Sequence, residues 1–229
     1  MEKLCIVNSE NKAVTDVLEQ YGYVCIPTQK SECVSEPIAL HADVLYLKSE
    51  NNKIFVSSCQ NDNIDMLKQR GYNIEAVKLA PGYKTECLLN MIITENNVIC
   101  NPKTCMDLSL LQSTKEIIEV KQGYTRCSTI ALNSDNFITE DEGIYSVLSK
   151  KGKNCLLIEK GYVRLDGYNY GFIGGASAYL KESNTLLFSG DISVHPDFER
   201  IKIFCKNINV TTAYIENMEL TDIGGVVFI

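Results

Sequence analysis

The stretch Asp43-Val44-Leu45-Tyr46-Leu47-Lys48-Ser49-Glu50-Asn51-Asn52-Lys53-Ile54-Phe55-Val56 contains two apolar runs separated by a short polar turn. The turn, Glu50-Asn51-Asn52, is rich in residues that tolerate left-handed backbone dihedrals, as tight hairpins require. The same arrangement recurs in residues 89–100, 128–139 and 176–188. Four similar hairpins predict a protein built from repeated units.

Helical and strand-like segments follow the hairpins in a regular order. Apolar residues at helical spacing precede Gly71 and Gly152, and a third such segment follows Pro196, which suits a first helical turn. Only a short helical segment, near Asp107 to Leu111, occupies this position after the second hairpin. Strand-like runs come next, at residues 73–77, 117–120, 154–158 and 210–215. The predicted unit is therefore strand, strand, helix, strand.

The two ends of the chain supply the parts of a fifth unit. Residues 14–21 present a helical face, and Gln20-Tyr21-Gly22-Tyr23 resembles Gln69-Arg70-Gly71-Tyr72 of the next unit. The first strand missing from this unit occurs in residues 222–229. The sequence therefore predicts one α/β domain of residues 1–229, a ring of five units closed by pairing of the N- and C-terminal segments. The expected repeats are 1–40 with 221–229, 41–81, 82–122, 123–170 and 171–220.

This pattern resembles the pentein fold, the five-bladed, pseudo-symmetric α/β propeller of the guanidino-group-modifying enzymes, over nearly the whole chain. A three-layer α/β sheet is the alternative, but its crossovers alternate one strand with one helix, whereas this chain repeats hairpins. The chain is also similar to an uncharacterised bacterial family of the same superfamily, a resemblance that implies a fold but no established activity. The segments that carry this second resemblance are Lys121-Gln122-Gly123-Tyr124, Gly171-Phe172-Ile173-Gly174-Gly175, Gly190-Asp191-Ile192, His195-Pro196-Asp197 and Asp222-Ile223-Gly224-Gly225.

Composition limits the classes of partner. A formal charge of −7 over 229 residues disfavours binding of nucleic acid through a basic surface. No apolar run approaches the roughly 20 residues of a membrane span, and the first eight residues lack signal-peptide features, so a cytoplasmic protein is expected. The 10 cysteines, spread from Cys5 to Cys205, are expected to be free thiols. Since no two have the spacing of a zinc knuckle and only 2 histidines exist, no metal or other cofactor is predicted.

A closed ring of similar units brings equivalent positions together at its axis, so residues at the starts of the first strands should converge. These positions supply an imidazole, thiols, carboxylates and glycines, which together suit catalysis. They are His41-Ala42-Asp43, Glu86-Cys87, Arg126-Cys127-Ser128, Gly174-Gly175 and Asp222-Ile223-Gly224-Gly225.

Three of these segments are similar to functional motifs of the enzymes with this fold. His41-Ala42-Asp43 resembles the His-any-Asp motif of the arginine and agmatine deiminases, in which the histidine handles protons and the carboxylate holds the guanidinium. The segment from Gly123 to Cys127-Ser128 is similar to the nucleophile segment of the dimethylarginine dimethylaminohydrolases. The segment Asp222-Ile223-Gly224-Gly225 resembles the one that supplies a substrate-binding carboxylate in the same families. Their cyclic order fits as well, with the nucleophile two blades after the histidine and the carboxylate one blade before it.

The resemblance implies a site in which Cys127 and His41 are catalytic and Asp43, Asp222, Arg126 and Gly175 contact substrate. Two departures concern the substrate. Gly174-Gly175 stands where a second substrate-binding aspartate with a neighbouring arginine is expected, and no counterpart of the family's C-terminal cysteine follows Phe228-Ile229.

The implied activity is that of a cysteine-dependent hydrolase or transferase acting on a small guanidine or amidine compound through a covalent thiouronium. Nearby positive charge, from Arg126, Lys121, the His41 imidazolium or the bound cation, is expected to populate the Cys127 thiolate near neutral pH. His41 would protonate the departing amine and then activate water, while Asp43 and Asp222 anchor the guanidinium through paired hydrogen bonds.

Structural alternatives exist for each assignment. Cys127 and His41 can instead pack or hydrogen-bond at the starts of strands, and Asp43 and Asp222 can instead cap turns. His195, before Pro196, suits a helix cap better than catalysis, while Asp191 and Lys121 are weaker candidates. The glycine-rich segment from Gly171 to Gly175 is not expected to bind phosphate, because a phosphate-binding loop is followed by a helix and this segment is not. For the whole chain, the alternative is a non-catalytic binding module for ribosomes or proteins, as in the ribosome anti-association factor of this fold.

Overall fold

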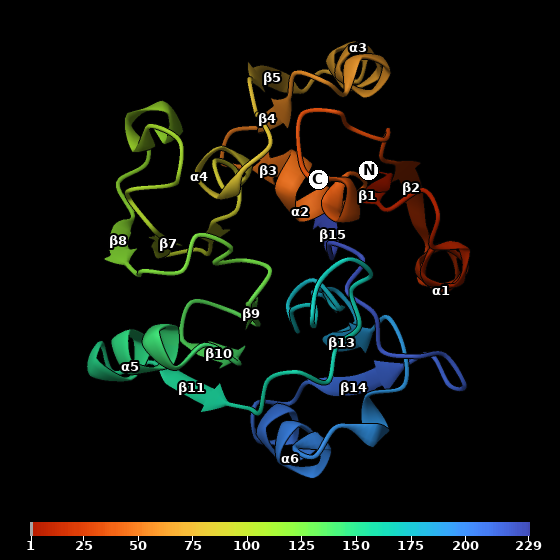
Figure 1. Ribbon diagram of the computed structural model, residues 1–229, viewed down its shortest axis with the longest axis vertical. Coiled ribbons are helices and arrows are strands. Elements are labelled where there is room, and N and C mark those ends of the chain that lie inside the picture. The colour runs from red at the N-terminus through yellow and green to blue at the C-terminus, as the bar shows by residue number, and fades with distance from the viewer. Residues whose placement is uncertain (1) are drawn as a thin grey trace.

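The computed structural model describes residues 2–229 and contains five three-stranded sheets. Figure 1 shows these sheets arranged around a common centre like the blades of a propeller. In each sheet an inner strand pairs antiparallel with a middle strand, and the middle strand pairs parallel with an outer one. The five blades are β15-β1-β2 (Val226–Phe228, Lys3–Val7, Tyr23–Pro27), β3-β4-β5 (Tyr46–Lys48, Lys53–Ser57, Asn73–Val77), β6-β7-β8 (Ile92–Ile93, Asn97–Cys100, Glu116–Glu119), β9-β10-β11 (Thr129–Ala131, Asn136–Thr139, Asn154–Leu157) and β12-β13-β14 (Ser177–Leu180, Thr185–Phe188, Thr211–Tyr214).

A helix links the middle strand to the outer strand in four of these blades. These helices are α1 (Lys12–Gln20), α3 (Asn61–Gln69), α5 (Glu142–Lys150) and α6 (Phe198–Asn207). The side chains of Asn11 and Asp141 cap α1 and α5, because each accepts a hydrogen bond from an otherwise unpaired backbone N–H of the first turn. In the remaining blade the link is the 3-10 helix η2 (Leu108–Leu111), as the short helical signal near Asp107 predicts.

The ring closes by pairing of the two ends of the chain, and the prediction of this closure is confirmed. Strand β15 runs antiparallel to β1, with Cys5 opposite Phe228 and Val7 opposite Val226. Val227 is buried in the core that the neighbouring blade also forms. The hairpin turns follow the expected chemistry too, since Asn51, Asn52 and Asn184 have positive φ angles.

The starts of two inner strands differ from the sequence-based expectation. Residues 43–45 lie in the helix α2 (Ala42–Leu45), and β3 begins only at Tyr46. In the next blade, β6 contains only Ile92–Ile93, and the short helix α4 (Tyr83–Glu86) comes before it. Periodicity does not distinguish a short buried helix from a buried strand, which is why the apolar run of 43–47 was compatible with both.

The cysteines show a second difference. Cys33 and Cys59 are joined by a disulfide with a Cα–Cα distance of 6.5 Å, so the expectation of free thiols is wrong for this pair. The other cysteines, including Cys127, are free. Within residues 2–229, no helix is both long and apolar enough to cross a membrane.

Candidate active site

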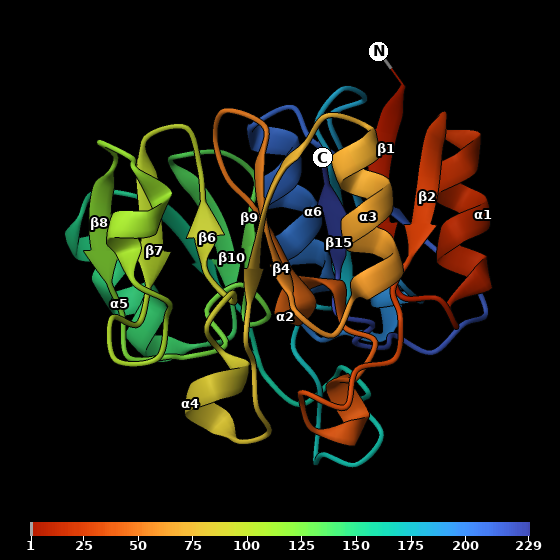
Figure 2. The ribbon, with the colours of Figure 1, turned by 90° about the horizontal axis from the view of Figure 1, so that it is seen from above.

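A cavity of about 270 Å³ is lined by residues that precede the inner strands of four blades, β3, β9, β12 and β15. Figure 2 shows α2 and α4 at this end of the ring, away from the N-terminus. Three polar residues that the sequence singles out, His41, Cys127 and Asp222, line the cavity. The rest of the lining is mainly aromatic or aliphatic: Ile38, Val44, Tyr124, Leu165, Tyr168, Asn169, Tyr170 and Phe172.

Cys127 lies between two polar side chains that come from other blades. Its Sγ donates to Oδ2 of Asp43 at 3.0 Å, and Nδ2 of Asn90 donates to Sγ at 2.9 Å. The thiol is buried, with 3% of the residue exposed. Because Asn90 also donates to the carbonyl of Asp43, the three residues are fixed relative to one another.

His41 and Asp222 form a second pair in the same cavity. Nδ1 of His41 lies 3.7 Å from Oδ1 of Asp222, and both side chains are buried. Asp222 accepts backbone hydrogen bonds from Phe172 and Gly224, at 2.8 and 2.9 Å. Oδ1 of Asp43, in contrast, is buried and has no hydrogen-bond partner among residues 2–229. An unpaired buried carboxylate oxygen suits a cationic ligand that donates hydrogen bonds.

The glycine pairs of the sequence allow the blades to approach closely at this point. A Cβ on Gly175 would lie 2.0 Å from Oδ1 of Asp222, and one on Gly224 would lie 2.3 Å from Cα of His41. Gly224 also has a φ of +76°, which other residues rarely adopt. Gly175 therefore provides space for the Asp222 carboxylate, and it is not among the residues that line the cavity around Cys127.

The electrostatics of the unliganded site differ from the expectation for Cys127. Burial and the negative charges of Asp43 and Asp222 raise the pKa of the Cys127 thiol well above its ordinary value. Burial also raises the pKa of Asp43, raises that of Asp222 to about 6, and lowers that of His41. The thiolate is therefore not populated near neutral pH without a ligand. The sequence did not indicate this, because the spacing of residues along the chain does not reveal how closely carboxylates approach the sulfur.

The other predicted site residues lie elsewhere. Arg126 directs its side chain away from this cavity, and its Nη2 donates to the carbonyl of Val226 at 2.8 Å. Asp191 caps the 3-10 helix η3 (Ile192–Val194) by accepting from the N–H of Ser193. His195 contacts the carbonyl of Glu159 and accepts from the N–H of Asp197, so its ring serves local structure.

Lys121 is exposed, and none of these four residues lines the cavity around Cys127. Within residues 2–229, no cluster of three or more histidine, cysteine, aspartate or glutamate side chains is arranged to hold a metal ion.

Asn90 is the residue that the sequence reading missed. The sequence predicts Glu86-Cys87 as the axial position of this blade, but it is Asn90 that contacts Cys127: its Oδ1 accepts from the N–H groups of Arg126 and Cys127. The available signal was a polar asparagine inside the apolar run Leu88-Leu89-Asn90-Met91-Ile92. Glu86 instead accepts from the hydroxyl of Tyr124 at 2.8 Å and so orients one aromatic wall of the cavity.

A family model described as "Family of unknown function (DUF6873)" matches residues 6–227, and the chain belongs to this family. No curated protein matches the sequence. The arrangement of the blades is that of the pentein fold, and solved structures with this architecture cover almost the whole chain.

Three of these structures are enzymes of guanidino-group modification. Dimethylarginine dimethylaminohydrolase from Pseudomonas aeruginosa, in complex with citrulline, is 9% identical with a TM-score of 0.65, and the match covers 100% of both chains. An amidinotransferase of the saxitoxin biosynthetic pathway from Microseira wollei is 10% identical with a TM-score of 0.57, covering 94% of this chain and 89% of that one. Agmatine deiminase from C. jejuni is 9% identical with a TM-score of 0.57, covering 96% and 91%. At these identities the likeness establishes the fold.

Proposed function

We propose that this chain is a cysteine-dependent enzyme that acts on a small guanidine or amidine compound, with Cys127 as nucleophile and His41 as proton carrier. The observation that carries the proposal is the grouping of Cys127, His41 and Asp222 around one cavity. Asp43 lies behind Cys127, hydrogen-bonded to its sulfur, and keeps one unpaired carboxylate oxygen. The solved enzymes of the same fold act on guanidino compounds, which supports this class of substrate.

A guanidinium ion offers what the buried carboxylates lack. Its planar N–H groups can donate to Asp43 and Asp222 in pairs, and its positive charge offsets the cost of keeping both carboxylates ionised in a buried site. The same charge lowers the pKa of Cys127, which burial and the carboxylates raise when no cation is bound. The substrate thus activates its own nucleophile.

The chemistry then proceeds in two balanced steps. Because burial lowers its pKa, His41 is a neutral imidazole and can accept the proton of Cys127. Sγ forms a bond to the guanidinium carbon, the bond from that carbon to the leaving nitrogen breaks, and His41 returns the proton to the departing amine. Water next attacks the thiouronium carbon and gives one proton to His41. Cleavage of the S–C bond then releases a urea-type product, the second proton of the water restores the thiol, and His41 returns its proton to solvent.

Asn90 supplies a donor at the sulfur throughout these steps. Its amide favours the thiolate over the thiol, because a hydrogen bond to a charged form stabilises that form. A transferase would follow the same first step, with an amine in place of water as the second nucleophile.

The lining of the cavity favours a substrate with an apolar substituent. Tyr124, Tyr168, Tyr170 and Phe172 can pack against such a substituent, and no lysine or arginine is among the residues of the described chain that line this cavity. A carboxylate such as that of arginine would therefore enter without a cationic partner, at a cost in binding free energy. We expect alkyl- or arylguanidines to be preferred over arginine.

Turnover of a guanidine panel tests this proposal. Benzylguanidine, butylguanidine, agmatine and arginine are incubated with the protein, and mass spectrometry follows loss of substrate and appearance of the urea-type product. We expect turnover of the first two to exceed that of arginine and to vanish in Cys127→Ser but not in Cys155→Ser, a matched change in a free thiol on β11. Absence of turnover and of any covalent adduct in the folded protein would favour the non-catalytic binding module.

A further inference from the structure

A second and larger cavity, of about 580 Å³, runs along the axis of the ring between the inner strands. Residues of β3, β6, β9, β12 and β15 all line this axial channel, so every blade contributes to it. Glu2, Lys3 and Ile229 also line it, which places it toward the end of the ring where the chain termini lie. No residue lines both the channel and the cavity around Cys127.

The channel has a cationic lining on a chain that is acidic overall. Lys3, Lys48, Arg126 and Lys181 line it, against the two carboxylates Glu2 and Glu182. Both carboxylates are already paired, Glu182 with Lys3 and Glu2 with Arg70. Within residues 2–229, the side chains of Lys48, Arg126 and Lys181 form no ion pair.

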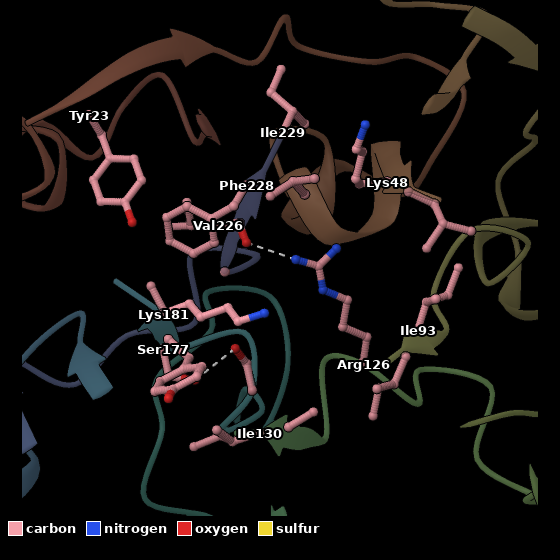
Figure 3. A pocket seen from close by; sticks show the side chains of 18 of the residues that line it. Tyr23, Lys48, Ile93, Arg126, Ile130, Ser177, Lys181, Val226, Phe228 and Ile229 are labelled. Atoms are coloured by element: carbon pink, nitrogen blue, oxygen red, sulfur yellow. Dashed lines mark hydrogen bonds between the residues drawn. The ribbon is translucent and has the colours of Figure 1, made fainter. Parts of the chain in front are cut away.

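Arg126 is the central residue of this lining. Figure 3 shows its guanidinium in the middle of the channel, with a hydrogen bond to the carbonyl of Val226, while Lys181 reaches into the same space from the far side. A guanidinium has five N–H donors, and this hydrogen bond is the one that Arg126 makes through its side chain within the described chain. Burial lowers the pKa of Arg126, while the negative charge of Asp43 acts in the opposite direction. No carboxylate of residues 2–229 forms an ion pair with this guanidinium.

Lys48 extends the cationic region from another blade. It is half-buried, burial lowers its pKa, and its ammonium lies 5.1 Å from the ring centre of Tyr72. A guanidinium can donate two parallel hydrogen bonds to two oxygens of a carboxylate or phosphate, and such charge-assisted hydrogen bonds strengthen in a confined site. Lys48 and Lys181 add positive charge to the lining of the same channel.

We infer that the axial channel binds a small organic or inorganic oxyanion, with Arg126 as the principal ligand and Lys48 and Lys181 as supporting charges. The site is separate from the cavity of Cys127 and does not depend on the function proposed for it. The oxyanion completes the hydrogen bonding of Arg126 and neutralises the excess positive charge of the channel lining.

Titration calorimetry with citrate, succinate and inorganic phosphate tests this inference. We expect saturable binding of one anion per chain, and its identity distinguishes a carboxylate from a phosphate ligand. Arg126→Gln should weaken binding about tenfold or more, because it removes a charge-assisted pair. Arg200→Gln, which removes the same charge from α6 outside the channel, should leave the affinity unchanged.

Near-UV circular dichroism checks that each variant is folded. If Arg126→Gln fails to fold, Lys181→Gln provides the test, since Lys181 is exposed and its loss should weaken binding several-fold without affecting the fold. The inference is overturned if none of the three anions binds the wild-type protein. It is also overturned if the folded channel variants bind as tightly as the wild type, or if Arg200→Gln weakens binding as much as they do.

Discussion

The sulfur of Cys127 donates a hydrogen bond to the carboxylate of Asp43 over 3.0 Å, although 84 positions separate the two residues in sequence. Burial raises the pKa of Cys127, and this contact adds to the effect, because the carboxylate accepts a hydrogen bond from the thiol and repels a thiolate. In the proposed reaction the same carboxylate docks the substrate cation, so Asp43 has opposite effects on reactivity toward neutral and cationic electrophiles.

Replacement of Asp43 by asparagine separates these effects. Because Asp43→Asn removes a negative charge beside the sulfur, the pKa of Cys127 should fall, and alkylation by the neutral reagent iodoacetamide near pH 7 should accelerate about tenfold per pKa unit. Asp191→Asn, at the cap of η3, is the matched control and should leave the rate unchanged. A rate in Asp43→Asn no faster than in the wild type would show that this carboxylate does not suppress the thiolate.

Removal of the Asn90 side chain should change the pKa of Cys127 in the direction opposite to Asp43→Asn. Asn90→Ala deletes the N–H donor to Sγ, so the pKa of Cys127 should rise and iodoacetamide labelling should slow by a factor of about 3 to 10. Since Asn90 also accepts from two backbone N–H groups, near-UV circular dichroism must show an intact fold. Faster labelling in a folded Asn90→Ala protein would contradict the role assigned to this amide.

The contact between Gly175 and Asp222 permits a double-mutant cycle. Gly175→Ala places a methyl group on the Asp222 carboxylate and should destabilise the protein by about 2 kcal/mol or more, as overpacking of a buried site does. Asp222→Ala removes the atoms that the methyl group meets, so in that background the cost of Gly175→Ala should largely disappear. Urea unfolding measures all four proteins, and additive effects would show that this contact does not limit the approach of the blades.

Glu140 gives a pH-dependent prediction. This buried glutamate accepts from the N–H of Ile173, and burial raises its pKa to about 8 from 4.5. The folded protein therefore binds its proton more tightly than the unfolded chain, and ionisation reduces stability progressively as the pH rises from about 4.5 to about 8. Glutamine cannot ionise, so Glu140→Gln should have little effect near pH 4 and should raise the free energy of unfolding by on the order of 2–4 kcal/mol above pH 8.

Urea unfolding across this pH range provides the measurement for Glu140. Glu142→Gln, on the exposed first turn of α5, is the control and should keep the pH dependence of the wild type, because it retains Glu140. Equal stability of Glu140→Gln and the wild type at high pH would indicate that Glu140 is ionised at no cost in the folded protein.

The repeated hairpins were sufficient to predict the ring, because each hairpin needs a neighbour to bury its apolar face and the two incomplete ends complement each other. The convergence of His41, Asp43, Cys127 and Asp222 followed from the ring, since equivalent positions meet at its axis. What the sequence does not contain is the direction of a side chain. Arg126 and Cys127 are consecutive, yet Arg126 lines the axial channel and Cys127 lines the other cavity, with His41 and Asp222.

The remaining differences have the same origin in tertiary structure. Asn90 occurs in an apolar run that resembles core, and only the packed blades show that its amide meets the sulfur. The shift in the pKa of Cys127 depends on burial and on a carboxylate from another blade, neither of which is local in sequence. The disulfide between Cys33 and Cys59 likewise joins residues 26 positions apart that folding brings together.

Covalent labelling with 2-chloroacetamidine tests the central claim, that Cys127 is a nucleophile activated by a bound amidinium or guanidinium cation. The probe carries its own positive charge, so it should dock on Asp43 and Asp222, lower the pKa of the adjacent thiol and be attacked with loss of chloride. Peptide mapping should place the first adduct on Cys127, ahead of the partly exposed free thiol Cys105. Benzylguanidine should slow this labelling, and Asp43→Asn should abolish the preference for Cys127 even though it speeds reaction with iodoacetamide. Labelling of Cys105 before Cys127, or labelling of Cys127 that is unchanged in Asp43→Asn and with benzylguanidine present, would contradict the claim.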